Sequence, residues 1–139
     1  MSVPMSVRVA DPVDDALSQY VERAGWGKSR VVNTALDEWL RIQGHPGIRF
    51  VPLPSGQRIA ALVDGPEVWT VVESWLDHDP ESRSVANVVE ATGLTSRQVE
   101  AALAYWADFR DDIDADLQRI HTAQREERAA WERRQALHG

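Results

Sequence analysis

The chain has 139 residues and no cysteine, so it can hold one ordinary domain or two small ones, and disulfides and thiolate metal sites are excluded. It has no signal-peptide pattern and no apolar run near the roughly 18 residues that span a bilayer, so we expect a cytoplasmic protein without a membrane partner. The net charge of −7 opposes a broadly basic nucleic-acid binder, yet residues 1–44 are near neutral, with five Lys or Arg against six Asp or Glu.

The first predicted element is a short strand over residues 5–10. Apolar and polar residues alternate there, with the period of two that is typical of a strand with one buried face. The apolar face consists of Met5, Val7 and Val9, and the opposite face carries Ser6 and Arg8.

Two amphipathic helices follow, predicted over residues 12–24 and 28–43. Asp11 is the predicted N-cap of the first helix, and Gly25 is its stop. Apolar residues recur at helical spacing in both segments, so each helix has one apolar face. In the second helix this face includes Leu36 and Trp39.

A single strand in this segment requires a partner, because its backbone N–H and C=O groups would otherwise be unpaired. The first 44 residues contain no second candidate strand. The economical solution is a second copy of the chain, which gives a two-stranded antiparallel ribbon over four helices. The core of this homodimer is then predicted to contain Met5, Val7, Val9, Leu36 and Trp39.

Residues 44–47 form a cluster of helix-breaking residues and mark the predicted domain boundary. Beyond it we expect a β-hairpin and several helices, with a capping box formed by Thr95 and Gln98. Residues 121–139 lose apolar periodicity and form a mixed-charge tail, either helical or frayed. The predicted elements are strands over residues 48–53 and 58–63 and helices over residues 66–77, 83–92, 96–109 and from residue 111 onward.

Residues 4–43, with strand alternation, Asp-Pro, an amphipathic helix and the run GWGKSRVVNTAL, resemble the ribbon-helix-helix repressors of the Arc, MetJ and CopG type. The resemblance implies that outward ribbon residues enter the major groove of an operator in double-stranded DNA. By position these are Pro4, Ser6 and Arg8, although a proline cannot read a base through a side-chain hydrogen bond. Arginine can reach guanine O6 and N7 with two donors. The resemblance also implies a backbone-phosphate contact at the start of the second helix, at Lys28, Ser29 and Arg30.

Residues 45–116 are similar to a small domain of bacterial antitoxins that are paired with PIN-like nuclease toxins. The similarity lies in HPGI, SGQRI and LTSRQVEAALAYWADFRDDID. It implies the antitoxin of a type II toxin-antitoxin module, which represses its own operon and neutralises a nuclease. A stand-alone transcriptional regulator and a protein-interaction adaptor, whose ribbon serves mainly for dimerisation, remain alternatives.

Other constellations favour structural roles. Residues 85–106 have helix-turn-helix spacing, but their acidic surroundings favour packing or protein binding over DNA contact. The Asp residues from Asp111 to Asp116 lack the glycine and the terminal glutamate of a calcium loop. The four histidines are dispersed in the sequence without metal-ligand spacing or a nearby Asp or Ser, so we expect no metal site, no cofactor and no enzyme.

The six tryptophans divide into two groups. Trp39, Trp69, Trp75 and Trp106 lie on apolar helix faces and are predicted to be core residues. Trp26 and Trp131 do not, and either could anchor a partner protein or cap a dimer surface. We select Trp131 as the partner-binding residue. The predicted organisation is thus a ribbon-helix-helix domain of residues 1–44, a hairpin and helix-turn-helix-like domain of residues 45–120, and a tail of residues 121–139.

Overall fold

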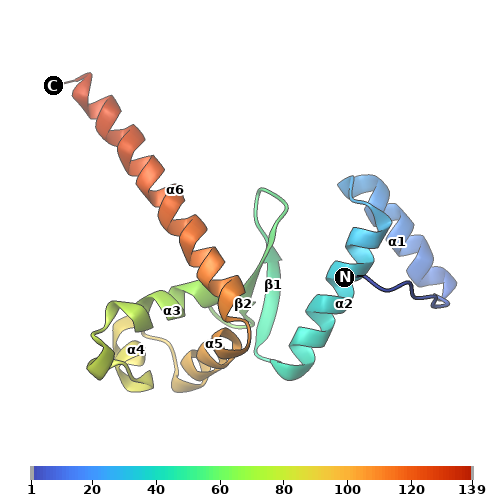
Figure 1. Ribbon diagram of the computed structural model, residues 1–139, viewed down its shortest axis with the longest axis horizontal. Helices are drawn as coiled ribbons and strands as arrows, with labels where there is room; N and C mark the ends of the chain where they lie inside the picture. Colours follow the sequence, from blue (N-terminus) through green and yellow to red (C-terminus); the bar gives the residue numbers. More distant parts are fainter. Residues whose placement is uncertain (1, 139) are drawn as a thin grey trace. The chain divides into compact units, whose positions relative to one another are not determined.

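The computed structural model describes residues 2–138 of the chain (Figure 1). Over these residues the protein is 67% helical, with six α-helices and one two-stranded antiparallel sheet, so the predicted class of helices with short β-structure is confirmed. The chain divides into two compact units, Met1–Gln43 (unit 1) and Gly44–Gly139 (unit 2). In the described part of the chain, no helix combines the length and apolar character that crossing a membrane requires.

Unit 1 contains α1 (Asp11–Ala24) and all but the last residue of α2 (Lys28–Gly44). Gly25 ends α1 in a left-handed conformation (φ 71°), as the sequence predicts, and its N–H donates to the Val21 carbonyl at 3.0 Å. The predicted N-cap is wrong by one residue. Ala10 caps α1, its carbonyl accepts the N–H groups of Val13 and Asp14, and Asp11 already belongs to the helix.

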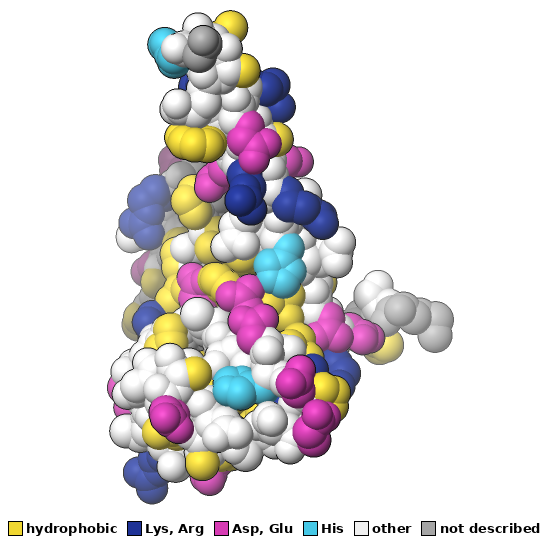
Figure 2. Space-filling view, turned by 90° about the vertical axis from the view of Figure 1, so that its left-hand side faces the viewer, with side chains coloured by type: hydrophobic (Ala, Val, Ile, Leu, Met, Phe, Trp, Pro, Cys, Tyr) yellow, Lys and Arg dark blue, Asp and Glu magenta, His cyan; other side chains and the backbone are white. Residues whose placement is uncertain are grey.

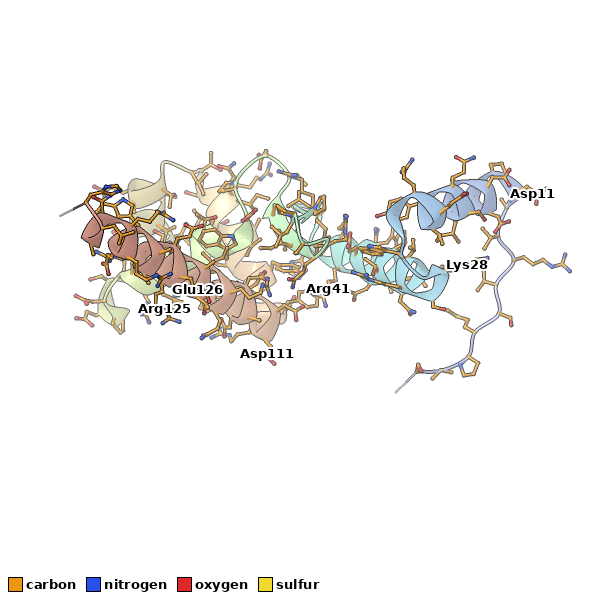
Figure 3. The ribbon with its side chains drawn as sticks, turned by 90° about the horizontal axis from the view of Figure 1, so that it is seen from above. Asp11, Lys28, Arg41, Asp111, Arg125 and Glu126 are labelled. Atoms are coloured by element: carbon orange, nitrogen blue, oxygen red, sulfur yellow. The ribbon has the colours of Figure 1, made fainter. Side chains whose placement is uncertain are left out.

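Residues 2–10 form neither a helix nor a strand in the single chain. They run as an extended trace to Asp11 (Figure 3). A strand is defined by ladder hydrogen bonds to a neighbour, and the two strands of unit 2 pair with each other. The strand predicted over residues 5–10 therefore stays a prediction that needs a second copy of the chain.

Unit 2 begins with the predicted β-hairpin, which is confirmed. Strands β1 (Ile48–Pro52) and β2 (Arg58–Leu62) pair antiparallel, with Phe50 opposite Ala60. The helices that follow are α3 (Val68–Asp77), α4 (Val85–Thr92), α5 (Ser96–Asp108) and α6 (Arg110–Ala136), with a 3₁₀ turn at Pro80–Ser82.

Two helices start later than the sequence predicts, for local reasons. Pro66 and Glu67 extend the sheet edge, since the Pro66 carbonyl accepts the Leu62 N–H at 2.9 Å, and α3 begins only at Val68. Ser84 caps α4, and its side chain accepts the Asn87 N–H at 3.1 Å. The predicted capping box of α5, Thr95 with Gln98, is confirmed.

The core of unit 2 lies between the hairpin and α3, α5 and the first turns of α6. Tyr105 is its largest fully buried side chain, and its ring packs on Phe109 with centroids 4.7 Å apart. The buried apolar cluster consists of Ile48, Ala60, Leu62, Val68, Val71, Val72, Val88, Val99, Ala102, Tyr105, Trp106, Ile113 and Leu117. α6 continues as one helix to Ala136, so the tail predicted over residues 121–139 takes its helical form over most of its length.

Candidate nucleic-acid interface and partner-binding surface

The apolar residues that the sequence assigns to a dimer core are exposed in the single chain. Val7 is 70% exposed and Trp39 is 60% exposed. Met5, Val9 and Leu36 are exposed as well, and no residue of α1 or α2 is buried. Trp39 is therefore not a core residue of this single chain, and the apolar faces of unit 1 have no cover within unit 1.

The predicted base-reading residues are solvent-accessible. Ser6 and Arg8 lie in the extended segment ahead of α1, and both are exposed. Neither side chain forms a hydrogen bond or an ion pair with another described residue. The Arg8 guanidinium thus has all its donors available to a ligand.

The start of α2 brings together the three residues predicted to contact phosphate. The first helical hydrogen bond runs from the Val31 N–H to the Gly27 carbonyl at 3.2 Å, so the N–H groups of Lys28, Ser29 and Arg30 precede it. Such free N–H groups at a helix N-terminus favour an anion.

Two side chains at this helix start are already engaged, which the sequence reading missed. Lys28 Nζ lies 3.7 Å from Asp14 Oδ1 in an exposed ion pair. The Arg30 guanidinium lies 3.6 Å from the centroid of the Trp26 ring. The spacing of Trp26 and Arg30, four residues apart, could have indicated this contact. Trp26 also packs edge-on against Tyr20, so it stabilises the turn of unit 1 and is not a free anchor.

In unit 2, the predicted helix-turn-helix elements α4 and α5 are joined by Gly93, which has a positive φ of 75°. Val88 and Val99 from the two helices are buried in the core. The exposed side of α5 carries Arg97 together with Glu100 and Asp108. This mixture of charges provides no continuous basic surface for a DNA groove.

The remaining predicted core tryptophans differ in burial. Trp106 is buried, and its indole N–H donates to Asp114 at 2.9 Å, whereas Trp69 and Trp75 are only half-buried. A groove of about 570 Å³ lies beside Trp75 and Trp106. Its arginines have structural roles, since Arg83 donates to backbone carbonyls and Arg110 stacks 4.2 Å from the Trp106 ring. The lining residues are Trp75, Leu76, Arg83, Trp106, Arg110, Asp114, Leu117, Gln118 and His121.

The fold supplies histidine partners that the sequence order hides. His45 lies 2.8 Å from the Asp108 carboxylate, 63 residues away, and His121 lies 2.7 Å from the Glu73 carboxylate, 48 residues away. The prediction that the histidines lack an acidic partner is therefore wrong for these two, each of which lies beside a carboxylate in the folded chain. Among the described residues no three His, Cys, Asp or Glu side chains gather in a metal-binding arrangement.

Trp131, the predicted partner-binding residue, is 55% exposed on α6. It lies past Leu117, the last buried residue of that helix. An exposed indole offers a large apolar surface to a partner.

No family model, curated protein or solved structure matches this chain.

Proposed function

We propose that the protein is a homodimeric DNA-binding repressor of its own operon that also binds and neutralises a nuclease toxin. The observation that carries this proposal is the lack of any buried residue in α1 and α2, together with the exposed apolar face of residues 5–9. Exposed apolar faces of this extent favour association. A second copy would cover them with a ribbon of two strands, as in the ribbon-helix-helix repressors that residues 4–43 resemble.

DNA reading in this proposal depends on two sets of residues. Two antiparallel strands would bring both copies of Ser6 and Arg8 to one surface about a two-fold axis, which suits an inverted or pseudo-palindromic operator. The start of α2, at Lys28 to Arg30, would hold a backbone phosphate on each side. The exposure of Arg8 and the free N–H groups of α2 support these roles.

Partner binding is assigned to residues 45–139. This part carries most of the negative charge and the motifs similar to antitoxins of PIN-like nucleases. Trp131 is the proposed contact, supported by its exposed indole. A chain that ends at Gly44 should keep DNA binding and lose the toxin in a co-purification from the native host; capture of the toxin by this short chain would overturn the division of roles.

The acidic balance favours one alternative, a protein-interaction adaptor. Arg8 is the one basic residue among residues 2–10, and the whole chain is acidic. Non-specific attraction to phosphate would then be weak, and the ribbon would serve for dimerisation alone.

A DNA-binding measurement separates these functions. Labelled DNA from upstream of the protein's own gene is titrated with the full chain, beside a scrambled fragment of equal length. We expect a dimer in light scattering and preferential binding of the native fragment, more weakly as salt rises. A dimer that binds both fragments equally would favour the adaptor, and a folded monomer would overturn the architecture.

A further inference from the structure

The second half of α6 lacks cover from the rest of unit 2. Leu117 is the last buried residue of the helix, and nothing between residues 122 and 137 is buried. Figure 1 shows this half extending away from α3, α4 and α5. We call residues 122–137 the C-terminal arm. Among the described residues, the polar contacts of the arm stay inside the helix, as in the Arg128–Glu132 pair at 3.6 Å.

Along one face of the arm, negatively charged residues come first and positively charged residues follow. Glu126 and Glu127 precede Arg133 and Arg134 by seven residues, which is two helical turns, or about 10 Å along the axis. This distance is too long for an ion pair within the helix. None of the four side chains forms an ion pair with another described residue. Figure 2 shows acidic and basic side chains alternating with apolar ones along α6.

A narrow row of apolar residues lies on the same face of the arm. Ala123, Ala130 and Leu137 are also spaced by seven residues, so they share the face that Glu126 and Arg134 flank. Leu137 is 84% exposed. Ala130 leaves room for close approach of a second helix, and charges at the edges of a helix pair set its orientation.

We propose that the C-terminal arm pairs antiparallel with the arm of a second copy, about a two-fold axis beside Ala130. Ala130 then meets its own copy, and Ala123 lies opposite Leu137 of the second copy. Residues at the same heptad position flank each other in an antiparallel pair. Glu126 therefore lies beside Arg133 of the second copy, and Glu127 lies beside Arg134 of the second copy.

The charges select this orientation. Parallel pairing in register would place both glutamates against glutamates and both arginines against arginines, which is unfavourable. The antiparallel pair contains four opposite-charge contacts instead, because the two-fold axis doubles each one. Trp131 lies about 100° around the helix from Ala130, at the edge of the interface, and stays accessible to a protein partner. The pairing requires neither DNA nor a toxin and is independent of those proposed roles.

Cysteine cross-linking in the full chain tests the pairing, because the natural sequence has no cysteine. Under mild oxidation, Ala130→Cys should form a disulfide-linked dimer roughly ten times faster than Gln124→Cys, an exposed control on another face of the same arm. Equal rates for these two variants would mean random collision and would overturn the proposal.

Mixed samples test the direction. Ala123→Cys mixed with Leu137→Cys should give the mixed disulfide faster than Ala123→Cys gives its own dimer, since residues 123 and 137 oppose each other only in the antiparallel arrangement. Faster self-linking of Ala123→Cys would indicate parallel helices and contradict the inference.

Charge exchange provides the rescue experiment. In the Ala130→Cys background, E126R with E127R should slow cross-linking about tenfold, because four attractive contacts become repulsive. R133E with R134E should slow it similarly. Combining all four changes restores opposite charges at each contact and should restore the rate. Circular dichroism checks that the arm remains helical. Unchanged rates in helical double variants, or a failed rescue in the helical quadruple variant, would refute the pairing.

Discussion

Units 1 and 2 distribute their apolar side chains in opposite ways. Every buried apolar residue of the described chain lies between Ile48 and Leu117, in unit 2. In unit 1, Val7, Trp39 and Leu40 are more than half exposed, although their spacing is that of residues that face a core. Amphipathic patterning therefore identifies an apolar face, but it does not say whether residues of the same chain cover that face.

The two units should consequently differ in how their stability depends on protein concentration. The core of unit 2 is enclosed by residues of one chain, so the loss of stability caused by a substitution in that core should not change on dilution. A unit whose core is shared between two copies becomes less stable on dilution, because dissociation and unfolding are linked. Substitutions in each unit, measured at several protein concentrations, test this difference.

Tyr105→Ala should have the largest effect. The Tyr105 side chain is 1% exposed, and its ring contacts His45, Phe50 and Phe109. Removing a buried aromatic ring costs about 3–5 kcal/mol, through lost burial and the cavity that remains. Chemical denaturation followed by tryptophan fluorescence should show this loss equally at low and high protein concentration. A loss that shrinks as the protein is concentrated would mean that unit 2 also depends on a second copy.

Val7→Asp tests unit 1. In the single chain Val7 is exposed, so a carboxylate at this position would cost almost nothing. In the proposed dimer core it would be an unpaired buried charge, which costs about 3–5 kcal/mol. In a chain that also carries E126R and E127R, so that the C-terminal arms do not pair, light scattering at micromolar concentration should then report a monomer. Ser6→Asp, on the opposite face of the same segment, is the matched control and should remain dimeric. If both variants stay dimeric, the ribbon does not hold the dimer.

The difference between local and long-range contacts determines how much of the fold the sequence predicts. The hairpin, the Thr95–Gln98 capping box and the Gly25 stop depend on residues close in sequence, and local patterns identify them. The strand predicted over residues 5–10 requires a partner strand, which the described residues of one chain do not supply. The sequence leaves the tail either helical or frayed because, beyond Ile120, residues of high helix propensity lack the apolar periodicity that identifies a helix packed on a core.

In the candidate site, too, the sequence predicts the features that depend on neighbouring residues and misses the contacts between distant ones. Exposure of Arg8 and the position of Lys28 at a helix start follow from local sequence. The Lys28–Asp14 pair joins two helices, so it could be found only once they were packed. His45 and Asp108 are 63 residues apart in the sequence, and no local sequence pattern predicts such a contact.

Arg8→Ala should change DNA binding without changing the fold of either unit. Loss of a bidentate guanine contact should cost about 1–3 kcal/mol per half-site and flatten the preference among sequences. Lys28→Ala is the comparison variant; it should weaken all sequences alike and reduce the salt slope by about one per lost phosphate contact. Competition binding to the DNA upstream of the gene, over a salt series, measures both quantities. A folded Arg8→Ala dimer with unchanged sequence preference would remove the ribbon from DNA reading and favour the adaptor.

Asp116→Asn should have the smallest effect, and only unit 2 should respond. Asp116 is buried beside Arg119, and burial raises the pKa of its carboxyl above the usual 3.8, although Arg119 opposes the shift. A raised pKa means that the folded state binds this proton more tightly than the unfolded state does. The ionised carboxylate therefore destabilises the fold, and this penalty develops as the pH rises above about 3.8.

Asparagine at position 116 does not ionise, so the variant should gain stability relative to the parent as the pH rises from about 3.8 through the raised pKa of Asp116, and then keep a constant difference. Urea unfolding at several pH values measures this difference, and Asp77→Asn, at an exposed position, corrects for the change in net charge. The gain should be independent of protein concentration, because Asp116 lies in the unit that encloses its own core. A difference that does not vary with pH would show that Arg119 fully compensates for the burial of this carboxylate.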